Sequence, residues 1–242
     1  MKRKRKLILI LILLIIVLLG VVIYFIYSRD VDSKDKVLEK QEEVLTEEEI
    51  DEDKAKLDEI NNLNLENEHV VGWIKINDSK IDYPILYSGD DYYIYYNYKK
   101  EFTNDGSIYI DKHNSLNDIN LIIHGHNMSN GNMFHDLINY KDKSYYDDHK
   151  IIDFYTLTEH KKYEIISVFL SKVYDKDDDV FKYYKFYGDL TIEEYNDYIN
   201  NIKDLSLYDF DVTIEYPTKL ITLSTCEYSN ENGRLVVVAK EI

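Results

Sequence analysis

The chain has 242 residues, with 46 Asp and Glu against 29 Lys and Arg, and its formal net charge is −17 at pH 7. Binding to nucleic acid requires a basic surface, so this balance argues against a nucleic-acid partner. The single cysteine, Cys226, cannot form a disulfide within the chain, which leaves either a small buried apolar residue or a reactive thiol.

The N-terminal residues have the pattern of a membrane anchor. Five basic residues, 2–6, precede 21 uncharged residues, 7–27. A helix of that length spans about 30 Å, the thickness of the hydrocarbon core of a bilayer. Because basic flanks stay in the cytoplasm, the pattern predicts a cytoplasmic segment (1–6), a single-pass anchor in the cell membrane (7–27) and an extracytoplasmic remainder. A cleaved secretory signal is the alternative, but its apolar region is usually about 7–15 residues, and residues 24–29 lack a small-residue cleavage site.

Residues 28–66 are predicted to form an acidic helical stalk. Residues 30–68 hold 16 Asp and Glu against five Lys. Apolar residues recur with the spacing of one helix face at Val37, Leu38, Val44, Leu45, Ile50, Leu57 and Ile60. A solvated stalk is the favoured interpretation. A dimerising coiled coil and packing of the apolar stripe on the following domain are alternatives.

From residue 67 onward, short β-branched and aromatic runs alternate with polar turns, which is typical of strands. Strands are predicted over 70–76, 79–86, 106–110, 119–124, 150–157, 162–171, 219–226 and 234–242. The Tyr-rich residues 91–98 are predicted as a helix or loop, 132–140 as a short helix and 191–205 as an amphipathic helix. The elements predict one domain over 67–242 that is mainly β with helices (α+β), a mixed barrel of about eight strands.

Two parts of this domain carry residues suited to nucleophilic chemistry. Cys226 ends one predicted strand and Arg234 begins the next, so a hairpin would place both side chains over one groove. A thiol needs a base or a positive neighbour to become a thiolate. His124 and His126 end an apolar strand that opens into a Gly/Asn-rich loop, a common position for catalytic residues.

A metal site is the competing interpretation of this region. His124 and His126 point to the same face of a strand and could act with His135 or Asp136. No Cys-x-x-Cys or His-Glu-x-x-His pattern is present, so a Cys–His arrangement is favoured over a metal. The acidic residues 174–181 lack the glycine and terminal glutamate of a calcium-binding loop and are interpreted as a solvated loop.

These motifs together resemble the sortase family, the membrane-anchored cysteine transpeptidases of Gram-positive bacteria. The resemblance rests on "TLSTC" followed by "GRLVVVAK", with "IIHGHNM" about a hundred residues upstream. The segments "VVGWIKINDSKIDYPIL", "DDYYIYYNY", "GSIYIDKHNS" and "GNMFHDL" follow the class B pattern in order and spacing. The resemblance covers residues 67–242 and implies a sortase-like closed β-barrel of about eight strands, with an N-terminal helix and a helix-bearing insert before the last strands.

The resemblance also implies roles for individual residues. Cys226 is expected to be the nucleophile, His126 the general acid and base, and Arg234 the residue that stabilises the oxyanion and the substrate. Substrate-binding positions are expected at Ser224, Thr225 and Glu227. His124 stands where relatives more often have Tyr, and no role is assigned to it. No cofactor and no metal are expected.

The expected reaction cleaves a C-terminal sorting signal of x-Pro-x-Thr type in secreted surface proteins and joins the threonine carbonyl to an amine of a lipid-linked peptidoglycan precursor. A pilin-polymerising sortase is an alternative, although the acidic stretch before the barrel has no lid motif of the kind that such enzymes often carry. A membrane-anchored binding module without activity is a second alternative, and it predicts a buried, inert Cys226.

Overall fold

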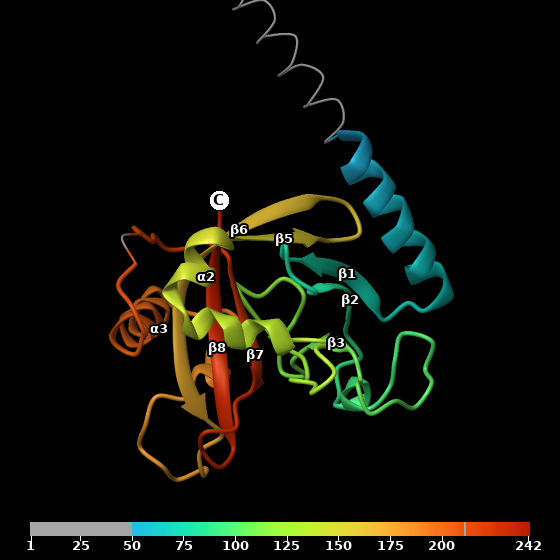
Figure 1. Ribbon diagram of the computed structural model, residues 1–242. Coiled ribbons are helices and arrows are strands. Elements are labelled where there is room, and N and C mark those ends of the chain that lie inside the picture. The colour runs from blue at the N-terminus through green and yellow to red at the C-terminus, as the bar shows by residue number, and fades with distance from the viewer. Residues whose placement is uncertain (1–49, 211) are drawn as a thin grey trace, which may run out of the picture. The chain divides into compact units, whose positions relative to one another are not determined.

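The computed structural model describes residues 50–210 and 212–242 of the chain. Eight strands form a closed barrel in the order β1-β2-β3-β4-β7-β8-β6-β5 (Figure 1). The pairs β2–β3 and β4–β7 are parallel and the other pairs are antiparallel, which confirms the prediction of a mixed eight-stranded barrel. The strands are β1 Val70–Lys75, β2 Asp82–Leu86, β3 Ile108–Ile110, β4 Asn120–His124, β5 Ile151–Tyr155, β6 His160–Lys172, β7 Leu220–Cys226 and β8 Gly233–Glu241.

Short helices occupy the connections between these strands. The Tyr-rich segment contains the 3-10 helix η1 (Tyr92–Ile94), and the helix predicted over 132–140 begins later, as the 3-10 helix η2 (His135–Lys141) followed by α2 (Lys143–Asp148). The insert between β6 and β7 holds η3 (Tyr183–Lys185) and α3 (Ile192–Asp204).

Strands β7 and β8 are apolar on both faces because both faces are covered. Leu235 and Val237 belong to the cluster that fills the barrel, whereas the alternate residues Val236 and Val238 pack against α3. An uninterrupted β-branched run, rather than strict alternation, is what such a strand requires. The insert therefore covers the outer face of the barrel beside the end of β7, where Cys226 lies.

Helix α3 is amphipathic, as predicted, and begins at a capping residue. Thr191 caps its first turn in a reciprocal capping box with Glu194. The helix buries Tyr195, Tyr198, Ile199 and Ile202 against the barrel. Ile192, the first residue of the helix, is 49% exposed.

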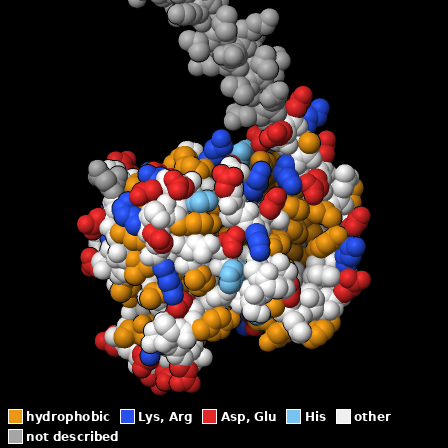
Figure 2. Space-filling view, in the orientation of Figure 1, with side chains coloured by type: hydrophobic (Ala, Val, Ile, Leu, Met, Phe, Trp, Pro, Cys, Tyr) orange, Lys and Arg blue, Asp and Glu red, His pale blue; other side chains and the backbone are white. Residues whose placement is uncertain are grey.

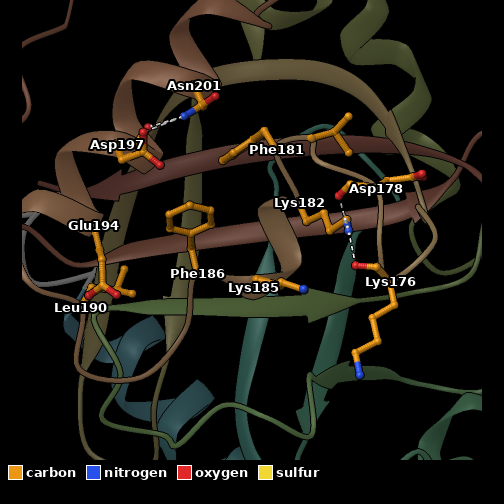
Figure 3. Close-up of a pocket in the computed structure, with 11 residues that line it drawn as sticks. Lys176, Asp178, Phe181, Lys182, Lys185, Phe186, Leu190, Glu194, Asp197 and Asn201 are labelled. Carbon is orange, nitrogen blue, oxygen red and sulfur yellow. Dashed lines mark hydrogen bonds between the residues drawn. The ribbon is translucent and has the colours of Figure 1, made fainter.

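The insert before α3 is organised around a buried lysine. The side chain of Lys182 is 6% exposed, and its Nζ donates hydrogen bonds to the carbonyl oxygens of Asp175, Lys176 and Asp178 at 2.7, 3.0 and 2.7 Å. Lys182 and Phe186 both line a pocket of about 570 Å³. Figure 3 shows the Lys182 ammonium group pointing toward Asp178 and Lys176 at one side of this pocket. The acidic loop thus folds around the buried ammonium group of Lys182. The next residue, Tyr183, contacts Ser224 in β7.

A helix over residues 50–66 precedes β1. From residue 55 onward it packs on the domain: Ile60 is fully buried with Val70 and Trp73, and Asn61 donates a hydrogen bond to the carbonyl of Leu157 at 2.9 Å. This part of the predicted stalk is therefore in contact with the barrel. Trp73, the single tryptophan of the chain, is a core residue that is 8% exposed.

The predicted cytoplasmic segment, the predicted anchor and the stalk before residue 50 lie outside the described residues. Among residues 50–210 and 212–242, no helix is long and apolar enough to cross a membrane. On the face shown in Figure 2, Lys and Arg side chains are interspersed with Asp and Glu.

Candidate active site

Cys226 and Arg234 are direct neighbours across two strands. Cys226 is the last residue of β7, Arg234 is the second residue of β8, and the antiparallel register pairs them. Both are half-buried. The Arg234 guanidinium donates only to the backbone carbonyls of Asn232 and Gly233, at 3.4 and 2.9 Å, and has no carboxylate partner among the described residues. The register therefore places the Cys226 thiol beside a guanidinium group whose other N–H donors have no hydrogen-bond partner among the described residues.

The parallel pairing of β4 with β7 places His126 near Cys226. His124 pairs with Ser224, so the segments that follow these two residues continue side by side toward His126 and Cys226. Asn127, the residue after His126, donates a hydrogen bond from Nδ2 to the carbonyl of Cys226 at 2.9 Å. The structure thus brings together the three residues that the sequence predicted as nucleophile, acid/base and oxyanion donor.

The imidazole of His126 contacts the Tyr-rich loop. Its Nε2 lies 2.9 Å from the carbonyl oxygen of Ile94, at the end of η1. The ring of Tyr95 lies with its centroid 6.1 Å from that of His126. No sequence pattern indicates this partner, because every residue has a backbone carbonyl.

Ser224 and Thr225 are buried residues with internal partners. The Ser224 side chain is 1% exposed, and its Oγ lies 2.7 Å from the hydroxyl of Tyr183 in η3. Thr225 is 2% exposed and donates from Oγ1 to the carbonyl of Gly125 at 2.8 Å. Burial raises the pKa of Tyr183 to about 12, so its hydroxyl is protonated at neutral pH. Tyr183 was missed by sequence reasoning, since nothing distinguishes it from the other 23 tyrosines.

Glu227 follows Cys226 and is held by an ion pair. Its carboxylate accepts hydrogen bonds from Lys141 at the end of η2 and from the backbone N–H of Ser229, the latter at 3.0 Å. The side-chain hydrogen bonds from Lys141 and Ser229 hold the pKa of Glu227 below its usual range. The Glu227 side chain is only 7% exposed, and its hydrogen bond from the N–H of Ser229 ties it to the turn between β7 and β8.

His124 forms a hydrogen bond with Asp111, the residue that follows the neighbouring strand β3. Its Nε2 lies 2.9 Å from Oδ2 of Asp111, and Oδ1 of Asp111 lies 2.7 Å from Nδ1 of His113. Burial raises the pKa of Asp111, but the hydrogen bonds from His124 and His113 outweigh it and hold the pKa well below its ordinary value. Within the described residues, no group of three or more His, Cys, Asp or Glu side chains could hold a metal ion.

Exposed aromatic side chains surround the pair of strands at this end of the barrel. Tyr228, two residues after Cys226, is 74% exposed, and Tyr95 beside His126 is 53% exposed. Phe102 is 68% exposed and stacks on Tyr95 with a centroid distance of 6.3 Å. Such rings offer apolar contact area to an extended peptide at low entropic cost.

Comparisons with known proteins identify this arrangement. The family model for the sortase domain matches residues 74–242. Sortase B of Listeria monocytogenes is 37% identical over 188 residues, which cover 76% of this chain and 74% of that protein. The solved structure of Clostridium perfringens sortase B has a TM-score of 0.69 and 31% identity, and the match covers 75% of this chain and 98% of that one. A Staphylococcus aureus sortase B–substrate complex has a TM-score of 0.67 and 30% identity, over 76% of this chain and 84% of that one.

The match with the family model covers the end of β1 and all of the strands β2 to β8, and it includes the segments that carry the thiol, the imidazole and the guanidinium group. The resemblance in the sequence motifs, the closed mixed barrel and the similarity to class B structures agree. The chain therefore belongs to the sortase family, in its class B, and is a cysteine transpeptidase.

Proposed function

We propose that this transpeptidase cleaves a C-terminal sorting signal of x-Pro-x-Thr type in secreted surface proteins and joins the new threonine carbonyl to an amine of a lipid-linked peptidoglycan precursor. The observation that carries the proposal is the cross-strand pair of Cys226 and Arg234, with His126 in the adjoining loop. A Staphylococcus aureus relative has been solved with its substrate, which supports a peptide substrate for this chain.

The first half-reaction acylates Cys226. The thiolate Sγ attacks the carbonyl carbon of the signal threonine, a C–S bond forms, and the carbonyl oxygen becomes an oxyanion. Arg234 donates hydrogen bonds to this oxygen or to the substrate backbone, and its guanidinium group stays charged at working pH. The C–N bond then breaks, and His126 gives its proton to the leaving amine. The products are a thioester on Cys226 and the released C-terminal tail.

The second half-reaction transfers the acyl group. The acceptor amine attacks the thioester, His126 now takes the proton from that amine, and Cys226 leaves as a thiolate. The net change is one amide bond broken and one formed. Water competes with the amine, so hydrolysis of the thioester is a side reaction.

Ser224, Thr225 and Glu227 are proposed to act on the substrate by shaping the groove around Cys226. Their polar atoms are bonded within the protein, to Tyr183, Gly125 and Lys141 respectively. Their contribution on this proposal is to hold the end of β7 and the wall of the groove in place, while the exposed aromatic rings contact the peptide.

We also propose that the chain is anchored in the cell membrane by residues 7–27, with residues 1–6 in the cytoplasm and the catalytic domain outside. The basic residues followed by 21 uncharged ones support this arrangement. It would place Cys226 where secreted proteins emerge from the membrane with their C-terminal tails still attached.

The test is peptide cleavage with detection of the covalent intermediate. Purified protein and its Cys226→Ala variant are incubated with quenched fluorescent peptides that carry x-Pro-x-Thr-x signals, including Asn-Pro and Ser-Pro forms. Cleavage by the wild type alone, with the mass of the N-terminal fragment added to Cys226, is the expected result. If no peptide is cleaved and the thiol does not react with an alkylating probe, both the proposed sorting signal and the proposed role of Cys226 as nucleophile are wrong for this chain.

The acceptor is tested in the same reaction. Peptidoglycan cross-bridge peptides and lysine-containing pilin peptides are added separately at equal concentration. We expect the cross-bridge amine to increase release of product and to appear in its mass. Exclusive transfer to the pilin lysine would instead indicate a pilin polymerase.

A further inference from the structure

The orientation of His126 is decided by a backbone group. Its Nε2 lies 2.9 Å from the carbonyl oxygen of Ile94, and a carbonyl oxygen can only accept a hydrogen bond. Nε2 therefore carries a hydrogen, and in the neutral ring Nδ1 has the lone pair. Among the described residues, Nδ1 has no hydrogen-bond partner, so it is the nitrogen that remains for proton exchange.

The carboxylate and amide side chains near His126 form hydrogen bonds with other residues. Asn127 donates from Nδ2 to the carbonyl of Cys226, and its Oδ1 lies 2.7 Å from Nδ1 of His135. Asp111 bonds to His124. In many cysteine and serine enzymes a side-chain acceptor holds the catalytic histidine in the correct tautomer. No described side chain does so for His126.

We propose that the carbonyl of Ile94 is the group that positions His126 for the reaction, by fixing the Nε2–H tautomer and directing Nδ1 to the proton that is exchanged. This inference rests on the proposed role of His126 as general acid and base. A neutral carbonyl dipole takes the place of a carboxylate, so the imidazole of His126 is oriented without a negatively charged hydrogen-bond partner of its own.

The loop holds this carbonyl by hydrogen bonds on both sides of Ile94. The carbonyl of Tyr93 accepts from the N–H of Ser107 at 3.0 Å. The carbonyl of Tyr95 accepts from the N–H of Thr103 at 2.9 Å. The Tyr-rich loop is thereby tied to the segment that leads into β3, and the direction of the Ile94 carbonyl is set by that segment.

Gly106 leaves the space that this carbonyl occupies. It is buried with φ at +59°, and a Cβ added there would lie 2.2 Å from the Ile94 oxygen and 2.9 Å from its carbonyl carbon. Real Cβ atoms do not approach that closely, so an alanine must displace the carbonyl. The same Cβ would lie 2.9 Å from the carbonyl oxygen of Tyr93, so Gly106→Ala displaces the backbone around Ile94, including the acceptor of His126, and leaves the His126 side chain itself unchanged.

Gly89 provides the matched control. Its φ is +73°, so an alanine meets the same unfavourable left-handed backbone, but a Cβ there has no atom within 4 Å. Comparing Gly89→Ala with Gly106→Ala separates displacement of the Ile94 carbonyl from the general cost of placing alanine in the left-handed backbone conformation.

The experiment reads the tautomer directly. Full-length protein labelled with ¹⁵N at histidine gives long-range ¹H–¹⁵N correlations that distinguish a protonated ring nitrogen from an unprotonated one, and His126→Gln identifies the signals. Spectra are recorded at a pH where the ring is neutral. We expect the Nε2–H tautomer in the wild type and in Gly89→Ala, and loss of that single tautomer in Gly106→Ala.

Kinetics of peptide cleavage give the second readout. We expect Gly106→Ala to lower kcat by about 10- to 100-fold, since small misplacement of a catalytic group costs up to about that much, while KM changes little. Gly89→Ala should keep the kcat of the wild type. A wild-type ring with hydrogen on Nδ1, or a folded Gly106→Ala with the kcat of Gly89→Ala, would overturn the inference.

The tautomer also separates this inference from the proposed function. If Gly106→Ala does not fold, the wild-type spectrum still decides whether Nε2 carries the hydrogen that the contact with the Ile94 carbonyl requires. If the wild type has the Nε2–H tautomer but cleaves no signal peptide, then the orientation of His126 stands and the proposed substrate is wrong.

Discussion

The hydrogen bond between Tyr183 and Ser224 gives a prediction that links the insert to the active site. The two hydroxyl oxygens are 2.7 Å apart, and both side chains are at most 1% exposed. Tyr183→Phe removes one partner and leaves the other buried without that bond, which should cost about 1–3 kcal/mol of the free energy of unfolding. Ser224→Ala should cost a similar amount, because it leaves the tyrosine hydroxyl buried. The double variant removes both groups, so its cost should be smaller than the sum of the single costs by about 0.5–1.5 kcal/mol.

The assay is urea unfolding of the wild type, the two single variants and the double variant. The slope of the unfolding free energy against urea concentration should be the same for all four proteins. Tyr95→Phe is the control, because Tyr95 is 53% exposed and its hydroxyl has no hydrogen-bond partner among the described residues. Its effect should stay within about 0.5 kcal/mol. Additive costs in the double variant would refute the reasoning, since they would mean that the two hydroxyl groups contribute independently.

The same four proteins distinguish two roles for Ser224. If Ser224 shapes the groove through Tyr183, both single variants should lower kcat/KM for peptide cleavage by similar factors, and the double variant should lose little more. If the Ser224 hydroxyl binds substrate itself, Ser224→Ala should raise KM while Tyr183→Phe leaves KM nearly unchanged. The second result would contradict the role proposed for this residue.

Three further changes test the packing, the charge pair and the chemistry. Ile60→Ala should lower the free energy of unfolding by about 2–5 kcal/mol because Ile60 is fully buried, whereas Leu65→Ala, at an 85% exposed position, should change it by less than about 0.5 kcal/mol; equal effects in urea unfolding would mean that the helix does not pack on the barrel. Asp111→Asn should destabilise the fold at neutral pH. The pKa of Asp111 is lowered in the folded state, so its stabilising contribution is present above the unfolded pKa of about 4 and is lost as pH falls below it. The difference in unfolding free energy between wild type and variant should therefore shrink below about pH 4, and a constant difference down to pH 2.5 would argue against the pairing with His124. Arg234→Ala should lower kcat/KM by about 100- to 1,000-fold with an unchanged circular dichroism spectrum, and Arg234→Lys should recover little, because a point charge cannot reproduce the guanidinium fork; near-wild-type turnover of the Lys variant would exclude that role.

The parts of this protein that depend on local sequence patterns could be predicted without a structure. The β-branched runs located the eight strands, and the capping and amphipathic pattern located α3. Cys226, His126 and Arg234 could be found because thiol, imidazole and guanidinium groups are rare enough in this chain to stand out: there is one cysteine, and two of the seven histidines end an apolar strand. The family resemblance then followed from a few motifs in a fixed order.

The hydrogen-bond partners that support these residues could not be predicted from local sequence patterns. The partners of the active-site residues come from distant segments: the Ile94 carbonyl from η1, Tyr183 from η3 and Lys141 from η2. Nothing in the sequence distinguishes these residues from neighbours of the same type. A backbone carbonyl exists at every position, and tyrosines and lysines are abundant in this chain. Their role arises from barrel closure, which brings together chain segments that are far apart in sequence, and that long-range proximity leaves no local pattern from which it could be predicted.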